Sequence, residues 1–381
     1  MKHKQLISLL LLSFLLVGCT LIPAREIEKL GIINARGVDK IEKDQIETSL
    51  ALFQFEGQSK DITKVIFGKS KTLKGAVEDA GLESNFNVTP EKIQLEVYGK
   101  ETAKEGILPY IDTLNRDASV PDTMYLSISD TTAKELITVK QKKITIGIGQ
   151  YLHGLIEENA TDHLFPRVTF QDFLSSFYDI GKDPFLPLFE LVNDVPKLTS
   201  IAIMQNDKYV GKIPAENKLL FNLTMKNVKD KRLELTLPMK PFEKHLEKEE
   251  NLSEQGGNLH TAYNVLKGKS KTTLINKDNL TYQTEIDLRL NLIEMSERVL
   301  IKDRQVIKLF EKEIEKAVSS RYEKILSRLQ SLNSDAFGYG TIYRIKKDGG
   351  KLTRAEWRAK FPTINVKFKV NANVITHGSV D

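Results

Sequence analysis

Four residues near the N-terminus, Leu16-Val17-Gly18-Cys19, have the types and order of a lipoprotein processing site. Such a site supports two reactions: a signal peptidase cuts between Gly18 and Cys19, and the Cys19 thiol carries a diacylglycerol. The apolar run over residues 6–17 that precedes it is typical of a secretory leader. This run is shorter than the roughly 20 residues that a membrane-spanning helix needs. We therefore expect a cleaved leader over residues 1–18 and a mature chain anchored by lipid on Cys19, with an N-acyl chain added.

The cysteine count supports this interpretation. Cys19 is the only cysteine in 381 residues, whereas an ordinary secretory signal, the alternative, would carry a cysteine here by chance. Two acyl chains anchor a protein stably, because each buried CH₂ contributes about 0.8 kcal/mol and a single chain binds only marginally. An exported chain with one cysteine forms no internal disulfide, and it cannot build a metal site of the Cys-x-x-Cys type.

The charge balance and the length limit the classes of function. Lys and Arg total 56 against 51 acidic residues, a net charge of +5, and loss of Lys2 and Lys4 with the leader leaves +3. This small excess is spread along the chain, so we expect no nucleic-acid binding, although it suits a protein near an anionic membrane. The mature chain of 381 − 18 = 363 residues exceeds what one hydrophobic core usually serves, which predicts two or three domains.

Other motifs that could carry chemistry are incomplete. Gly-Lys-Ser-Lys-Thr occurs at 68–72 and 268–272, but Thr63 and Tyr263 stand where a P-loop requires glycine, so we interpret both as solvated turns. The six histidines lack the i, i+4 spacing of a helical zinc pair; His153 lies near acidic residues, but a surface or capping role is favoured. The sequence also has no Gly-x-Ser-x-Gly elbow. We predict no catalytic residue, no metal and no cofactor.

The elements that precede residue 199 predict a mixed α/β N-terminal domain over 19–198. Apolar patterns predict strands at 27–38, 45–55, 93–97 and 124–128, and helices at 72–82, 102–114, 131–139 and 172–177. Pro109 should kink or restart the second helix, and Asp130 should cap the third. Strands that alternate with helices are typical of α/β organisation.

Two further domains are predicted, which makes the whole chain α+β with about three domains. Residues 199–255 should form a small β-rich middle domain, with a linker at 195–199, a hairpin at 199–213, and strands at 219–223 and 233–237. Residues 256–381 should form an antiparallel sheet packed by a long helix. Strict alternation marks strands at 286–292 and 364–374, and an apolar stripe predicts an amphipathic helix at 303–332.

Trp357 is the only tryptophan of the chain and stands shortly before the last strand. A tryptophan at this place most often packs between a helix end and a sheet. The alternative is a binding hot spot, in which Trp357 contacts a partner protein.

Several short motifs follow one another along the chain. They are Cys19, Arg25-Glu26-Ile27, Leu30-Gly31-Ile32, Gly37-Val38-Asp39-Lys40, Leu114-Asn115-Arg116-Asp117, Ala202-Ile203, Val210-Gly211-Lys212, Ser334-Asp335-Ala336-Phe337-Gly338-Tyr339-Gly340, Trp357 and Phe361-Pro362. In order and spacing the chain resembles the C-subunit lipoproteins of bacterial spore germinant receptors, the Ger(x)C family. It departs from them at Thr20-Leu21, where family members often carry Trp-Asp, so this chain lacks any contact that such a tryptophan makes.

The resemblance implies a three-domain α+β lipoprotein on the outer face of the spore inner membrane. It also implies assembly with an A-type integral membrane subunit and a B-type transporter-like subunit, which together respond to small germinants. No catalytic activity is known for the family. The alternative is a solute-binding lipoprotein that delivers a ligand to a transporter, but this needs two similar α/β lobes, and the last third of the chain is not a repeat of the first. An envelope hydrolase lacks any candidate nucleophile.

Overall fold

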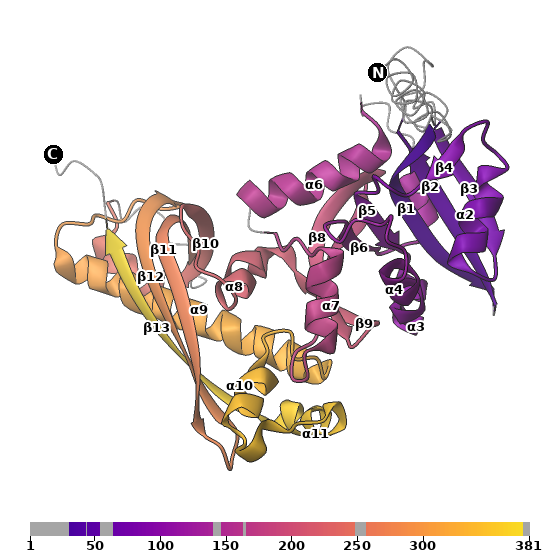
Figure 1. The fold of residues 1–381 in the computed structure, drawn as a ribbon. Coiled ribbons are helices and arrows are strands. Elements are labelled where there is room, and N and C mark those ends of the chain that lie inside the picture. The colour runs from indigo at the N-terminus through magenta and orange to yellow at the C-terminus, as the bar shows by residue number, and fades with distance from the viewer. Residues whose placement is uncertain are drawn as a thin grey trace, which may run out of the picture.

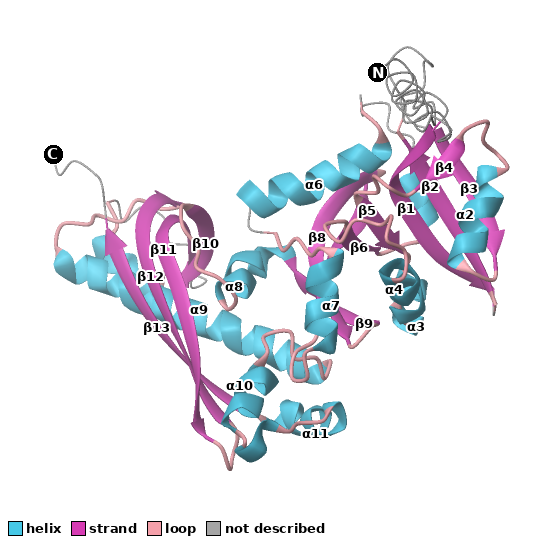
Figure 2. Ribbon diagram, viewed as in Figure 1, coloured by secondary structure: helices cyan, strands magenta, loops and turns pink. Residues whose placement is uncertain are grey.

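The computed structural model of the protein describes residues 30–42, 44–53, 64–139, 146–162, 165–247 and 257–375. Two sheets organise these residues, one of nine strands and one of four strands (Figure 1). Helices pack against both sheets (Figure 2), so the predicted α and β architecture with more than one domain is confirmed. The predicted leader over 1–18 and Cys19 lie outside the described residues.

The larger sheet mixes parallel and antiparallel strands. Its order is β3-β2-β1-β5-β6-β7-β8-β9, and β4 pairs with β1. The strands are β1 (Leu30–Glu42), β2 (Gln45–Leu52), β3 (Lys64–Ser70), β4 (Asn87–Thr89), β5 (Leu95–Tyr98), β6 (Tyr125–Ser129), β7 (Phe185–Val192), β8 (Val195–Gln205) and β9 (Lys208–Pro214). The central strands β1, β5, β6 and β7 run parallel, and antiparallel hairpins flank them. Both faces of β5 and β6 are buried, as is usual for parallel strands covered by helices.

Six helices of the described residues belong to this half, and a threonine side chain caps three of them. They are α2 (Leu73–Gly81), α3 (Lys100–Glu105), α4 (Leu108–Asn115), α5 (Ala133–Ile137), α6 (Ile148–Asp162) and α7 (Phe170–Tyr178). Pro109 stands in the first turn of α4, so the predicted helix restarts there. The prediction that Asp130 caps the third helix is wrong. Helix α5 begins at Ala133, two residues later than predicted, so the capping position falls on Thr132, whose hydroxyl accepts from the Glu135 amide.

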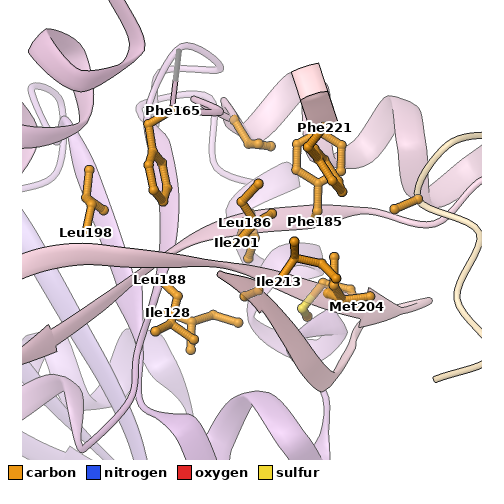
Figure 3. Close-up of a cluster of buried hydrophobic side chains, with 14 of the residues drawn as sticks. Ile128, Phe165, Phe185, Leu186, Leu188, Leu198, Ile201, Met204, Ile213 and Phe221 are labelled. Atoms are coloured by element: carbon orange, nitrogen blue, oxygen red, sulfur yellow. The ribbon is translucent and has the colours of Figure 1, made fainter. Parts of the chain in front are cut away.

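The hydrophobic core continues from the larger sheet toward the C-terminal part. Figure 3 shows Leu186 and Leu188 of β7 packed with Ile201 of β8, close to Phe221 of helix α8 (Lys218–Leu223). The rings of Phe185 and Phe221 meet edge to face, with centroids 5.0 Å apart. Helix α8 therefore joins the core of the larger sheet to the elements that follow it.

The smaller sheet lies on a long helix. Its order is β10-β11-β12-β13, with β10 (Lys231–Pro238), β11 (Asn258–Asn276), β12 (Thr281–Met295) and β13 (Asn365–Ile375). Helix α9 (Arg304–Ser331) crosses one face of it (Figure 2), and Asp303 caps the helix through the amides of Gln305 and Val306. The buried stripe of α9, including Phe310, Ile314 and Val318, packs on the apolar side of the strands. The predicted sheet with its long helix is confirmed.

One part of that prediction is wrong, because the sheet is not wholly antiparallel. Strand β13 pairs with β12 in parallel. Between them the chain passes through α9, α10 (Tyr339–Lys346), α11 (Arg354–Lys360) and the short turns η5 (Asp348–Gly350) and η6 (Phe361–Thr363). A crossover of this length returns the chain to the start of the sheet, so the next strand runs in the same direction.

The strands predicted for a middle domain are divided between the two sheets. Residues 195–199, predicted as a linker, belong to β8, because their alternating side chains pair with β7. The predicted 199–213 hairpin is confirmed as β8 and β9, whereas 219–223 forms helix α8 after turn η3 (Ala215–Asn217). Strand β10 is confirmed but joins the smaller sheet, and η4 (Lys240–His245) follows it.

The two Gly-Lys-Ser-Lys-Thr segments are not both turns. Gly68 lies in β3, and residues 268–272 lie entirely within β11. Strand pairing explains both cases, since β3 pairs with β2 and β11 pairs with β12 over these residues. Neither segment has the loop that would hold a phosphate.

Candidate functional site

The residues predicted to carry the lipid chemistry, Gly18 and Cys19, lie outside the described residues. Trp357 is described and belongs to helix α11. Within the described part of the chain, no group of three or more His, Cys, Asp and Glu side chains is arranged to hold a metal ion. The site that the structure does build is a group of buried polar side chains around Trp357, at the meeting of the two sheets.

Trp357 is buried, with 2% of its surface exposed. Its ring stacks on Tyr343 with centroids 5.7 Å apart and also meets Phe361. The indole Nε1 donates a hydrogen bond to Asp335 Oδ2 at 3.0 Å. The predicted packing role is therefore confirmed, and the predicted contact of Trp357 with a partner gains no support, because the ring is not available at the surface.

Asp335 is fully buried and accepts hydrogen bonds from several parts of the chain. Its carboxylate accepts hydrogen bonds from the amides of Gly338 and Gly340, both at 2.8 Å, in addition to the one from Trp357. Burial raises the pKa of Asp335 to about 7, and the backbone amide donors oppose that rise. The side chain thus fixes the turn between α9 and α10 and attaches it to α11.

Asp183 connects this turn to the larger sheet. Its carboxylate accepts from the amide of Asp335 at 2.8 Å and from the amide of Asn206, in the β8–β9 turn, at 2.9 Å. Arg358 of α11 pairs with both carboxylate oxygens, and only 2% of the Asp183 side chain is exposed. Arg358 also donates to the carbonyl of Asn333 at 2.7 Å.

We call Asp183, Asp335, Trp357 and Arg358 the aspartate junction. It ties the segment before β7 and the β8–β9 turn to α11 and the end of α9. All its members are buried or nearly so, and the charge of Asp183 is paired, as a buried carboxylate requires. The junction holds the two sheets in one arrangement, and it does not offer a nucleophile or an open ligand position.

Glycines allow the backbones at the junction to meet. A Cβ on Gly340 would lie 2.5 Å from the Gly181 Cα and 2.5 Å from the Trp357 ring. Gly181 has φ +108, a conformation that other residues rarely adopt. The Gly338-Tyr339-Gly340 sequence is therefore required by close packing of the two parts of the chain.

A second buried aspartate organises the larger sheet. Asp39 Oδ1 accepts from the amide of Ala133 and Oδ2 from the amide of Lys134, each at 2.8 Å, at the start of α5. Burial raises the pKa of Asp39, and the two backbone amides oppose the rise. The Asp39 side chain thus joins β1 to α5 and has a structural role.

A buried ion pair lies next to this aspartate in the sheet. Arg36 Nε donates to Glu96 Oε2 at 2.8 Å, between the parallel strands β1 and β5. The side chains are 5% and 0% exposed. Each charge compensates the other, so the pair connects the two strands at one register.

His153 is a packed histidine. Its ring stacks on Tyr125 with centroids 5.0 Å apart, and burial lowers its pKa. His163, the other histidine of this region, lies outside the described residues. The arrangement around His153 is typical of packing and not of metal binding.

A cleft of about 1200 Å³ separates the two sheets on the side of α6 and α8. One wall is the edge strand β10, and the opposite wall is the β7–β8 turn with the outer part of α6. Its lining mixes apolar residues such as Leu155 and Val195 with charged ones such as Lys218 and Arg321. No residue of the aspartate junction lines the cleft.

Both parts of the chain match known protein families. Residues 23–191 match the family described as "Spore germination protein N-terminal domain", and residues 199–378 match "Spore germination B3/ GerAC like, C-terminal". The chain belongs to the Ger(x)C family. The first match ends in β7 and the second begins in β8. The aspartate junction therefore joins Asp183 of the first family segment to Asp335, Trp357 and Arg358 of the second.

Individual proteins are similar over the same span. Spore germination protein GerQC of Bacillus cereus is 22% identical over 372 residues, 97% of each chain. Putative spore germination protein YfkR of Bacillus subtilis (strain 168) is 19% identical over 94% of this chain and 92% of that protein. A solved structure, "Crystal Structure of the GerBC protein", is 16% identical with a TM-score of 0.48, and it covers 92% of this chain and 100% of that one.

Several family motifs of this Ger(x)C chain carry the structure described above. Asp39 accepts hydrogen bonds from the first two amides of α5. Asp335 and Trp357 belong to the aspartate junction, and the Gly340 amide donates to Asp335. Sequence reasoning found Trp357 but missed Asp183 and Arg358, because their partners are 152 and 175 residues away along the chain. The signal was present in the glycines of residues 334–340, which indicated a crowded turn. In the described part of the chain no helix is long and apolar enough to cross a bilayer.

Proposed function

We propose that this Ger(x)C protein is a lipid-anchored, non-catalytic subunit of a nutrient germinant receptor. In this proposal it is exported, held on the outer face of the spore inner membrane by lipid on Cys19, and assembled with A-type and B-type integral membrane subunits. It contributes to triggering germination through protein contacts. The match of both family segments over nearly the whole chain is the observation that carries the proposal.

The bonded state of the buried acidic side chains and the arrangement of the two sheets support a role in protein contacts. The buried acids Asp39, Asp183, Glu96 and Asp335 all have bonded partners in the fold. None of these four acids lines the cleft, and each one bonds to neighbouring parts of the fold, so their roles are structural. A rigid arrangement of two sheets is what a subunit needs in order to present one surface to its neighbours.

The solute-binding alternative requires two similar α/β lobes. The larger sheet has parallel central strands with helices, whereas the smaller one has four strands on a single long helix. The two parts therefore lack the internal similarity of such lobes. Isothermal titration of the purified protein with amino acids and sugars separates the two functions, since tight direct binding would support the alternative.

The lipid anchor is tested by replacing Cys19. We expect Cys19→Ala to abolish metabolic labelling with a fatty acid and to reduce the germination of spores in response to nutrients. Thr20→Ala, one residue farther on, keeps the processing sequence and serves as the matched control. Normal nutrient germination of spores that carry unlabelled Cys19→Ala protein would contradict the proposal.

A further inference from the structure

Strand β10 is a free edge of the smaller sheet. It pairs with β11 on one side and has no strand on the other among the described residues. Cross-strand bonds fix which backbone groups face outward: Met239 N donates to Gly257 O, and Ser296 N donates to His260 O, both at 2.9 Å. By the alternation of an antiparallel ladder, the N–H and C=O groups of Arg232, Glu234 and Thr236 therefore point away from β11.

The cleft between the two sheets runs along this edge. Every residue from 231 to 236 lines it. Among the described residues, no group outside the sheet is hydrogen-bonded to the outward backbone groups of Arg232, Glu234 and Thr236. An unpaired strand edge is a template for another strand, and natural proteins usually cover or blunt such an edge. Here the edge is long, eight residues, and opens into a cavity.

The opposite wall is apolar and exposed. Val192 and Val195, at the β7–β8 turn, are 41% and 43% exposed and line the cleft. Leu155 and Tyr151 of α6 extend this wall and are only partly buried. An extended chain laid against β10 would direct alternate side chains toward these residues, because side chains of a strand alternate between its faces.

The charges of the cleft favour an acidic occupant. Five cations line it (Lys197, Lys218, Lys231, Arg232 and Arg321) against three acids (Glu216, Glu234 and Glu294). Arg232 pairs with both Glu234 and Glu294, at 3.0 and 3.5 Å, so two acids are neutralised by one cation.

Two of the remaining cations are partly desolvated. Burial lowers the pKa of Lys218 and of Arg321. Glu234 acts on Lys218, and Glu216 and then Glu234 act on Arg321, in each case without an ion pair. Within the described residues, neither has an acid at ion-pairing distance. Partly buried charge without a close partner is costly, and a carboxylate entering the cleft would compensate it.

We propose that the cleft binds an extended acidic segment of a partner polypeptide, which adds to β10 as a further strand of the smaller sheet. The size of the cleft, about 1200 Å³, exceeds the roughly 300–1,000 Å³ of small-molecule pockets and suits a chain segment. Main-chain bonds to the edge provide affinity, and the cations and valines select the side chains. This inference rests on the proposed function, because it specifies one of the protein contacts through which the subunit acts.

The test uses the purified full-length protein and a fluorescein-labelled peptide of eight residues that alternates valine and glutamate. We expect the anisotropy of this peptide to report saturable binding, and a valine–lysine peptide of equal length to bind at least about tenfold more weakly, since it meets surplus cations. Hydrogen exchange of residues 231–238 should slow when the acidic peptide is added, because the outward amides gain bonds.

Two variants separate strand addition from general attraction. Thr236→Pro removes an outward N–H without touching the ladder to β11, and Thr236→Ala keeps it while removing the same side-chain bond to His260. We expect about a fivefold loss of affinity in the proline variant and none in the alanine variant. Arg321→Ala should weaken binding of the acidic peptide alone.

Three outcomes would overturn the proposal: no saturable binding of the acidic peptide, equal binding of the lysine peptide, or unchanged exchange of the β10 amides in the bound state. The exchange measurement needs no variant, so it decides the matter even if Thr236→Pro fails to fold. None of these measurements depends on the lipid on Cys19 or on germination, so failure here is distinguishable from failure of the proposed function.

Discussion

The ion pair between Arg358 and Asp183 should give one of the largest single-residue effects on stability. Asp183 is buried at the point where the two sheets meet, and Arg358 is the cation that neutralises it. The change Arg358→Ala leaves a buried carboxylate without a counter-charge. Removing one partner of a buried pair typically costs 3–5 kcal/mol, because the other charge stays desolvated.

The structure places this case near the lower end of that range. Asp183 keeps two backbone donors, the amides of Asn206 and Asp335, and the Arg358 side chain is 20% exposed, so water reaches part of the pair. We therefore expect Arg358→Ala to lower the free energy of unfolding by about 3 kcal/mol. The variant also loses the bond to the Asn333 carbonyl, which contributes a smaller part of that loss.

The assay is urea denaturation of the purified protein, followed by the fluorescence of Trp357, the only tryptophan, which packs beside the pair. Arg344→Ala is the matched control, because Arg344 pairs with the more exposed Asp179 at 2.8 Å and should cost less than about 1 kcal/mol. In Arg358→Ala with Asp183→Asn, part of the loss should return, because no buried charge remains. A loss below about 1 kcal/mol for Arg358→Ala, equal to the control, would refute the reasoning.

Three further effects follow from the buried groups. Burial raises the pKa of Asp335 to about 7 in the folded state, against 3.8 when unfolded, so its contribution to stability is greatest below about pH 4 and falls as the pH rises toward 7. In thermal melts at pH 4 to 7, Asp335→Asn should therefore weaken the fall of the melting temperature with pH. An unchanged pH dependence would assign this fall to other groups. Gly340→Ala should lower the melting temperature by several degrees, because its Cβ would meet backbone at 2.5 Å, whereas Gly154→Ala, which meets nothing, should not lower it. Asp39→Ala should cost about 1 kcal/mol in urea denaturation through loss of its bonds to the first two amides of α5, and a neutral result would deny that role.

The sequence predicted the elements whose apolar pattern is regular. Helix α9 and strand β12 follow their periodic stripes, and both were predicted within a few residues. The short apolar run Leu219-Leu220-Phe221 predicts a strand, but residues 218–223 form helix α8, because periodicity alone cannot assign so short a run to helix or strand. All five residues from 219 to 223 are buried, so this helix shows no polar face that would have revealed it.

Sheet membership could not be predicted in the same way. Which sheet β8 or β10 joins depends on partners far along the chain, and the direction of β13 depends on the crossover through α9. The same limit applies to the aspartate junction, since Asp183 and Arg358 are 175 residues apart. Trp357 stands out because it is unique in the sequence, whereas no sequence pattern marks Asp335 as its hydrogen-bond partner.

The most direct test of the proposed receptor role is to determine the N-terminal modification and the neighbours of the protein extracted from spore membranes. Mass spectrometry of the protein purified from membranes of dormant spores, after crosslinking, measures its N-terminus and its neighbours together. We predict a mature chain that begins at Cys19, carries a diacylglycerol and is crosslinked to A-type and B-type integral membrane subunits. An unmodified N-terminus without such neighbours would contradict the account.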